Sequence, residues 1–122
     1  MLDSAQQVGF VGVTDLDDAQ RFYGDLLGLP LEDARPFALV HATASTQLRI
    51  TRVDRVAPAP YTVLGWAVDD LDAEVDRLAG RGVAFTRYDG LGQDDRGIWT
   101  APGGARIAWF RDPDGNTLSL QQ

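Results

Sequence analysis

The sequence offers few side chains with the chemistry of a catalytic group. It contains no cysteine and a single histidine, His41. Nucleophilic catalysis needs a hydroxyl or thiol held beside a base, and neither a serine nor a cluster of carboxylates accompanies His41 in a pattern that would supply one. We therefore interpret His41 as a half-buried or surface imidazole with one hydrogen bond.

Carboxylates are more numerous, but local structure explains most of them. Five stand at the starts of predicted helices, where they cap free N–H groups and interact favourably with the helix dipole: Asp15, Asp17, Asp18, Asp70 and Asp72. Four others fall in predicted loops: Glu32, Asp33, Asp94 and Asp95. A loop carboxylate that reached a cleft could act as a general base.

The residues from 8 to 28 predict a strand followed by a helix. The apolar run Val8–Val13 is long enough for one strand. Asp15 then suits the N-cap position, and apolar residues recur at helical spacing from Leu16 to Leu27. Gly28 follows as a residue that can adopt the left-handed conformation at which helices end.

The second half of the chain repeats this pattern. Residues 63–68 form another apolar run, Asp70 is the next N-cap candidate, an apolar stripe begins at Leu71, and Gly82 ends it. Asp70 lies 55 residues after Asp15, and the same offset relates the two strands and the two helix starts. A shared offset across three features indicates an internal duplication.

Further short apolar or β-branched runs predict the other strands, at residues 29–31, 37–42, 46–51, 83–85, 97–100, 106–111 and 116–121. Residues 89–97 are rich in glycine and acid and predict a loop. The layout is an α+β fold in which a βαβββ module occurs twice. We place module one at 1–55, a proline-containing joint at 53–60 and module two at 61–122, within a single domain.

Composition excludes several classes of partner. The net charge is −7 and the pI is about 4.4, whereas nucleic acids and anionic membranes are bound by clustered Lys and Arg. No apolar run approaches the roughly 20 residues of a membrane span, and Met1 is not followed by the pattern of a secretion signal. We expect a cytoplasmic protein that binds neither nucleic acid nor membrane.

Three segments of the chain carry a resemblance to a known family: Val13-Thr14-Asp15-Leu16 with Arg21-Phe22-Tyr23 and Leu27-Gly28-Leu29, Val68-Asp69-Asp70-Leu71-Asp72, and Trp109-Phe110-Arg111-Asp112-Pro113-Asp114-Gly115-Asn116. In this order and spacing, the chain resembles the vicinal oxygen chelate proteins, which include glyoxalase I, bleomycin resistance proteins and extradiol dioxygenases. The resemblance implies two tandem βαβββ modules, a curled mixed sheet with a central cleft, and a homodimer.

The resemblance also implies where a metal would bind. Enzymes of this family hold a divalent metal with one His, Glu or Gln ligand at each of four strand positions, which correspond here to Val8, Arg49, Val63 and Ser119. Valine has no lone pair, arginine is a permanent cation, and serine is a poor ligand for a transition metal. We therefore expect no metal site and no cofactor.

Alternation along the strands assigns residues to the implied cleft. The candidate ligand-binding residues are Phe10, Gln47, Arg49, Gly65, Trp99, Trp109 and Ser119. Arg49 is interpreted either as an anchor for an anion or carbonyl, or as an exposed strand arginine paired with a carboxylate. The sequence leaves the face of Trp109 open, and Trp66 is expected to pack in the core.

These residues favour a binding protein over an enzyme. The first hypothesis is metal-free binding of a small, largely apolar or aromatic drug or metabolite, which would thereby be sequestered. The alternatives are a metal-independent lyase, isomerase or hydrolase that uses Arg49 and a carboxylate, a metal-dependent lyase or dioxygenase with non-standard ligands, and a scaffold whose cleft binds nothing specific. A small molecule and a second copy of the chain are the expected partners.

Overall fold

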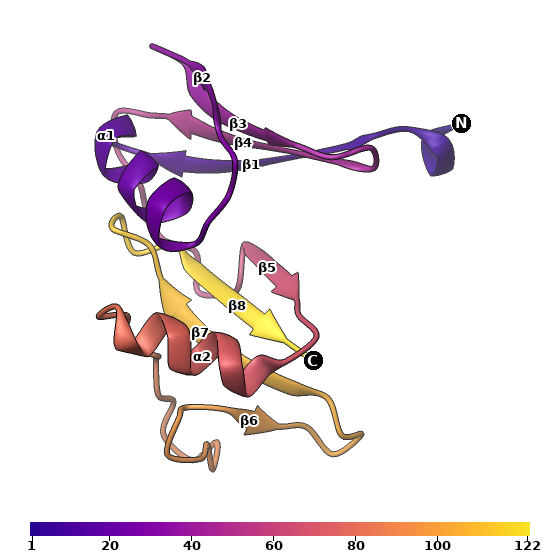
Figure 1. Cartoon of the computed structure of the whole chain (residues 1–122), viewed down its shortest axis with the longest axis vertical. Coiled ribbons are helices and arrows are strands. Elements are labelled where there is room, and N and C mark those ends of the chain that lie inside the picture. Colours follow the sequence, from indigo (N-terminus) through magenta and orange to yellow (C-terminus); the bar gives the residue numbers. More distant parts are fainter. The chain divides into compact units, whose positions relative to one another are not determined.

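The computed structural model describes all residues from Met1 to Gln122. The chain divides into two compact units, Met1–Ala57 and Pro58–Gln122. Each unit contains a four-stranded mixed sheet and a helix in the order βαβββ (Figure 1). The predicted α+β fold with two βαβββ modules is therefore confirmed. No helix has the length and apolar character needed to cross a bilayer.

The sheet of the first unit has the strand order β1-β4-β3-β2. Strand β1 runs parallel to β4, and the other neighbours are antiparallel. A short 3₁₀ turn, η1 (Leu2–Ser4), precedes the sheet. The strands span Gln7–Val13 (β1), Glu32–Ala34 (β2), Ala38–Ala42 (β3) and Thr46–Arg52 (β4).

The sheet of the second unit repeats this topology in the order β5-β8-β7-β6. Strand β5 is parallel to β8, and the remaining pairs are antiparallel. The strands span Leu64–Ala67 (β5), Trp99–Thr100 (β6), Arg106–Arg111 (β7) and Thr117–Gln121 (β8). Two sheets with the same order and the same strand directions are what an internal duplication produces.

The helix of the first unit begins and ends at the predicted residues. The Asp15 carboxylate accepts hydrogen bonds from the N–H groups of Asp17 (2.8 Å) and Asp18 (3.0 Å), and Gly28 has a φ of 82°. Between these ends, α1 (Leu16–Ala19) continues as a π-helical segment, η2 (Gln20–Leu26). The apolar stripe does not reveal this change, because the same side of the helix is buried throughout.

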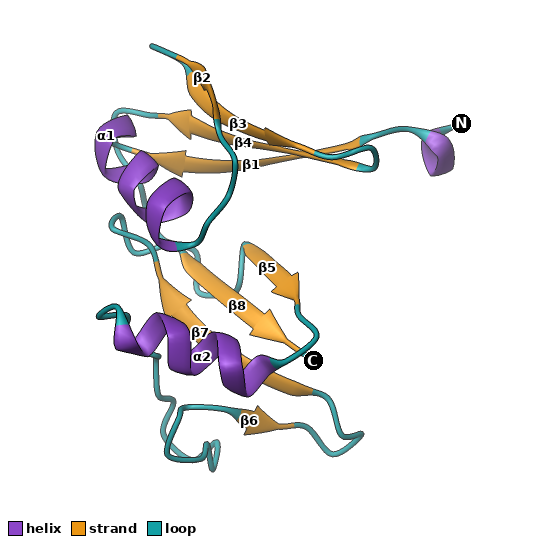
Figure 2. Cartoon of the chain, in the orientation of Figure 1, coloured by secondary structure: helices purple, strands orange, loops and turns teal.

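The helix of the second unit, α2 (Leu71–Gly80), packs on one face of its sheet (Figure 2). Asp70 caps it by accepting a hydrogen bond from the N–H of Ala73 at 3.1 Å. Its apolar stripe is fully buried together with the residues of β7 and β8 that face it: Leu71, Val75, Leu78, Ala108, Phe110, Leu118 and Leu120. Burial of this apolar surface is the main stabilising contribution to the unit.

One predicted strand is absent, and the predicted edge strand begins three residues later than expected. Residues 83–85 have no regular structure; the N–H of Val83 bonds to the carbonyl of Leu78 and so closes the end of α2. Residues 29–31 also lie outside any strand, and β2 begins only at Glu32. Glu32 and Asp33 therefore lie in a strand instead of the predicted loop. Short apolar runs do not by themselves separate strands from extended loops.

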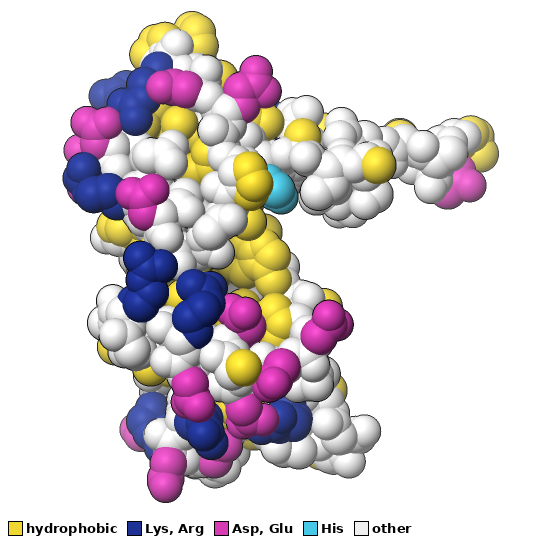
Figure 3. All heavy atoms as spheres, viewed as in Figure 1, with side chains coloured by type: hydrophobic (Ala, Val, Ile, Leu, Met, Phe, Trp, Pro, Cys, Tyr) yellow, Lys and Arg dark blue, Asp and Glu magenta, His cyan; other side chains and the backbone are white.

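Ion pairs connect α2 to strand β7 and to the loop before β6. Acidic and arginine side chains lie side by side around this helix (Figure 3). The Arg106 guanidinium of β7 donates two hydrogen bonds, both of 2.9 Å, to the Asp72 carboxylate of α2. Arg96 makes a similar pair with Asp76, at 2.8 and 3.1 Å. The hydrogen bond from Arg106 is the largest cause that holds the pKa of Asp72 below its ordinary value of 3.8.

We expect the Arg106–Asp72 pair to contribute to stability at neutral pH but not in acid. Because the folded-state pKa of Asp72 is lowered, its contribution is present above the unfolded pKa and is lost as the pH falls through the folded value. Arg106→Gln should therefore unfold at lower urea than the wild type at pH 7, and this difference should shrink below about pH 4.

Urea unfolding between pH 3 and pH 7 measures this effect. Arg55→Gln is the matched control, because it removes the same charge from an exposed arginine without an ion pair. If the difference in unfolding midpoint between the wild type and Arg106→Gln stayed constant down to pH 3, Arg106 would stabilise the protein through packing alone.

Candidate functional site

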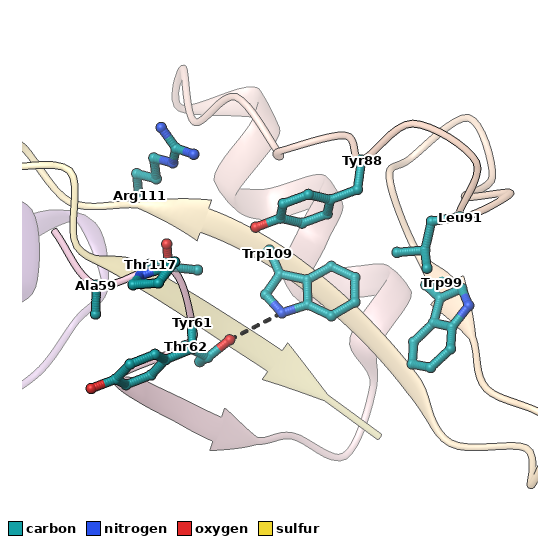
Figure 4. A pocket seen from close by; sticks show the side chains of 10 residues that line it. Ala59, Tyr61, Thr62, Tyr88, Leu91, Trp99, Trp109, Arg111 and Thr117 are labelled. Carbon is teal, nitrogen blue, oxygen red and sulfur yellow. Dashed lines mark hydrogen bonds between the residues drawn. The ribbon is translucent and has the colours of Figure 1, made fainter.

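An aromatic groove of about 640 Å³ opens on the second unit (Figure 4). Strands β6, β7 and β8, the chain before β5 and the chain between α2 and β6 contribute to it. Its lining consists of Ala59, Pro60, Tyr61, Thr62, Tyr88, Leu91, Trp99, Trp109, Arg111 and Thr117. Aromatic rings and aliphatic groups dominate this lining, so the groove suits an apolar guest.

The indole of Trp109 lies at the centre of the groove. The Tyr88 ring meets it edge to face at a centroid distance of 5.4 Å and an interplanar angle of 89°. The Trp99 ring lies 6.0 Å away at 31°. The Nε1–H of Trp109 donates a hydrogen bond of 3.1 Å to the hydroxyl of Thr62, drawn as the dashed line in Figure 4. These contacts fix the orientation of the central ring.

The alternation of β7 explains why Trp109 faces the groove. Ala108 and Phe110 are fully buried beneath α2. Because successive side chains of a strand point to opposite faces, Trp109 and Arg111 must lie on the other face of the sheet, and both line the groove. The structure thus decides the face of Trp109, which the sequence left open.

The side chain of Gln93 organises the loop that carries Tyr88. Its Nε2 donates hydrogen bonds to the carbonyls of Thr86 (2.9 Å) and Gly97 (2.7 Å), and its Oε1 accepts one from the N–H of Tyr88 (2.7 Å). The side chain of Gln93 thus connects the two ends of the glycine- and acid-rich loop through hydrogen bonds to their backbone. Gln93 is therefore a positioning residue for the Tyr88 ring.

Trp99 and Trp109 are the two predicted binding residues that line this groove. Gly65 and Ser119 are cross-strand partners in the same sheet, but neither is part of the lining. Ser119 is only 6% exposed, and a Cβ added at Gly65 would lie 2.4 Å from its hydroxyl oxygen. The Ser119 hydroxyl thus occupies the space that the absent side chain of Gly65 leaves.

The other predicted binding residues form a separate cluster on the exposed face of the first sheet. Phe10 pairs with Arg49, and Val8 pairs with Gln47, in the parallel register of β1 and β4. Phe10 is 65% exposed, while Gln47 and Arg49 are half-buried. Arg49 is not paired with any carboxylate.

His41 and two of the candidate acids, Asp33 and Asp94, take part in local structure. The Nδ1 of half-buried His41 lies 3.1 Å from the carbonyl oxygen of Pro30, in line with the interpretation of a single hydrogen bond. The Asp33 carboxylate pairs with Arg35 at 3.1 Å. The Asp94 carboxylate accepts hydrogen bonds from two backbone N–H groups of its own loop. None of these side chains lines the aromatic groove.

The residues present do not fit a divalent metal. The four positions that the family resemblance points to hold Val8, Arg49, Val63 and Ser119. The structure also contains no group of three or more His, Cys, Asp or Glu side chains that could hold a metal ion. Aliphatic and cationic side chains in place of N or O ligands give no coordination sphere.

The candidate binding residues from the sequence did not include eight of the ten lining residues: Ala59, Pro60, Tyr61, Thr62, Tyr88, Leu91, Arg111 and Thr117. For Arg111 a signal existed, because it lies two residues after Trp109 in one strand and must share its face. For Tyr88 and Leu91 no local pattern was available, because their position depends on how Gln93 folds the loop.

Comparison with known proteins places this fold in a family. The sequence model of the Glyoxalase/Bleomycin resistance protein/Dioxygenase superfamily matches residues 5–120. The chain is similar to the structure of TnmS3, an antibiotic binding protein from Streptomyces sp. CB03234, with 32% identity and a TM-score of 0.72 over 100% of this chain and 98% of that one.

Two further structures show the same similarity. A glyoxalase/bleomycin resistance protein from the same Streptomyces strain is 31% identical, with a TM-score of 0.67 over 97% of this chain and 100% of that one. A superfamily member from Sphaerobacter thermophilus DSM 20745 is 26% identical, with a TM-score of 0.75 over 99% and 98% of the two chains. No match was found among curated proteins.

We expect Gln93→Ala to disturb the groove and to destabilise the protein. The substitution removes the partners of three backbone groups, and each group that water cannot then reach costs about 1–3 kcal/mol. Because one of the three bonds is exposed and the other two are only part-buried, we expect the cost of about one such group. The free energy of unfolding in urea should fall by about 1–3 kcal/mol, and the near-ultraviolet circular dichroism of the coupled Tyr88 and Trp109 rings should change. Gln6→Ala is the control, because Gln6 makes one exposed hydrogen bond, to Thr43. Equal effects of the two variants would contradict the role assigned to Gln93.

Proposed function

Because this chain belongs to the Glyoxalase/Bleomycin resistance protein/Dioxygenase superfamily, we propose that it binds a small planar aromatic molecule in the aromatic groove without a metal ion. The observation that carries the proposal is the arrangement of Tyr88, Trp99 and Trp109 around one apolar hollow. These rings offer flat surfaces to a planar guest.

The dimensions and surface of the groove support this proposal. Its volume of about 640 Å³ lies within the range of roughly 300–1,000 Å³ that is common for small-molecule sites. Aromatic pairs in offset or edge-to-face contact contribute about 0.5–1.5 kcal/mol each beyond the burial of their area. Because hydrogen bonding and ring contacts already orient Trp109, little side-chain freedom is lost when a ligand binds.

The chemistry of the lining favours binding over turnover. The ten lining residues include no Asp, Glu, His, Cys or Lys. The hydroxyls of Thr62, Tyr88 and Thr117 therefore have no base among the lining residues that would activate them as nucleophiles. A guest in this groove meets aromatic surfaces and hydrogen-bonding groups, but no carboxylate, imidazole or amine that could serve as a base.

The relatives support the class of ligand. TnmS3 is an antibiotic binding protein, and this chain has 32% identity to it over nearly the whole of both chains. An antibiotic or a comparable aromatic metabolite is therefore the ligand class that we propose, and sequestration is the role.

Titration of the intrinsic tryptophan fluorescence with a panel of neutral planar aromatic compounds, such as anthraquinone and acridone derivatives, tests this function. We expect saturable quenching that is unchanged in excess EDTA. Trp99→Leu and Trp109→Leu should each weaken binding by roughly tenfold, equivalent to about 1.4 kcal/mol of lost ring contact.

Trp66→Leu is the matched control, because Trp66 lies on β5 and does not line the groove. The affinity of the Trp66→Leu variant for the aromatic compounds, measured by calorimetry, should stay close to that of the wild type. Absence of both quenching and a thermal shift across the panel would refute the function, and loss of binding in EDTA would refute its independence of metal.

A further inference from the structure

Arg111 is the one charged residue that lines the aromatic groove. No ion pair or side-chain hydrogen bond engages its guanidinium. The chain carries 18 acidic residues and 11 Lys and Arg residues, so a lining whose single charged residue is an unpaired arginine is unusual for this protein. The electrostatic potential inside the groove is therefore more positive than the net charge of −7 suggests.

Two smaller hollows of about 380 Å³ show the contrast. One lies beside α2 and contains Arg96 with Asp76, whose closest atoms are 2.8 Å apart. The other lies at the start of α1 and contains Arg35 with Asp17, also 2.8 Å apart. In both, an arginine charge is neutralised within the hollow itself. Of these three hollows, the aromatic groove is the one that combines an arginine with a lining free of carboxylates.

The acid nearest to Arg111 in sequence is already engaged. Asp112 is 5% exposed, and its carboxylate accepts hydrogen bonds from the N–H groups of Asp114 (3.0 Å) and Asn116 (2.9 Å) and from the Asn116 amide (2.8 Å). These bonds shape the turn between β7 and β8. They leave the carboxylate of Asp112 directed into the turn, while Arg111 is exposed on the opposite side of the strand.

The groove therefore has two chemically different ends. Figure 4 shows Arg111 at one end, with the Tyr88 hydroxyl directed toward that side, and Leu91 with Trp99 at the other end. Trp109 lies between them. A ligand that filled this groove would place a ring system along Trp109 and Trp99 and a polar substituent beside Arg111.

We propose that the ligand of the groove is an aromatic anion, in which a carboxylate or a comparable anionic oxygen group pairs with Arg111 while the rings contact Trp109 and Trp99. The proposal rests on the function proposed above and specifies its ligand class. Arginine suits this role because its guanidinium remains charged and presents a planar set of donors that matches a carboxylate. Such charge-assisted pairs are stronger than neutral hydrogen bonds.

Isothermal titration calorimetry with two matched probes tests this inference. The probes are 2-naphthoate and its neutral analogue 2-naphthamide, which share the ring system and differ in charge. For the wild type we expect naphthoate to bind about five- to tenfold more tightly than naphthamide, and this preference to decrease between 50 mM and 500 mM NaCl.

The variants separate the role of Arg111 from that of the net charge. Arg111→Gln should abolish the preference for naphthoate, because naphthoate binding weakens about five- to tenfold, to the level of naphthamide. Arg111→Lys should retain part of the preference, because it keeps the charge but not the planar donors. Arg55→Gln, which removes the same charge from an exposed site in the other unit, should behave like the wild type.

The outcomes distinguish this inference from the proposed function. If both probes bind the wild type equally, or if Arg111→Gln keeps the preference, the anionic ligand class is wrong while aromatic binding stands. If neither probe binds and the panel of neutral aromatic compounds fails as well, both proposals are overturned. Circular dichroism and the melting temperature of each variant are measured to exclude unfolding as the cause of a lost preference for naphthoate.

Discussion

The burial of Phe110 beneath α2 is the packing constraint on which the second unit depends. Phe110 has no exposed surface, and its ring lies 5.7 Å from that of Phe85. A large aromatic side chain buried in this way fixes the register of β7 relative to the helix, because a shift by one residue would place Trp109 in the core and Phe110 in solvent. The packing of the core thus decides the lining of the groove, because the residues of β7 that do not face α2, Trp109 and Arg111, lie on the opposite face of the sheet.

The two units share the architecture expected of an internal duplication, but the side chains on the open faces of their sheets differ. Both sheets have the same order and strand directions, and in both the helix covers one face. On the other face, the first unit displays Phe10 beside Arg49. The second unit has Gly65 beside a buried Ser119 at the corresponding edge and gathers its aromatic rings farther along the sheet, over β6 and β7. Residues that pack against a helix are constrained by volume, whereas the open face is free to diverge.

This divergence gives the proposed binding surface, whose side chains do not include the ligands that a metal needs. The positions that the family resemblance points to carry aliphatic, hydroxyl and guanidinium groups. The groove of the second unit instead presents aromatic rings and one charged side chain, that of Arg111. Aromatic surface provides affinity with little directional demand, while one charged group provides orientation and discrimination. The proposed role, sequestration of an aromatic compound, uses both properties and requires no catalytic group.

The sequence alone determined the repeat and the helix caps at Asp15 and Asp70, because these depend on neighbours within a few residues or on a fixed offset. Three short motifs carried the resemblance to the family. The sequence also identified Trp99 and Trp109 as binding candidates. The tertiary structure alone decided that Tyr88 and Leu91 join them, and that the face which Trp109 shares with Arg111 is the one that lines the groove. That outcome depends on which face of β7 the helix buries and on how Gln93 closes the loop, and both are contacts between residues that no local pattern connects.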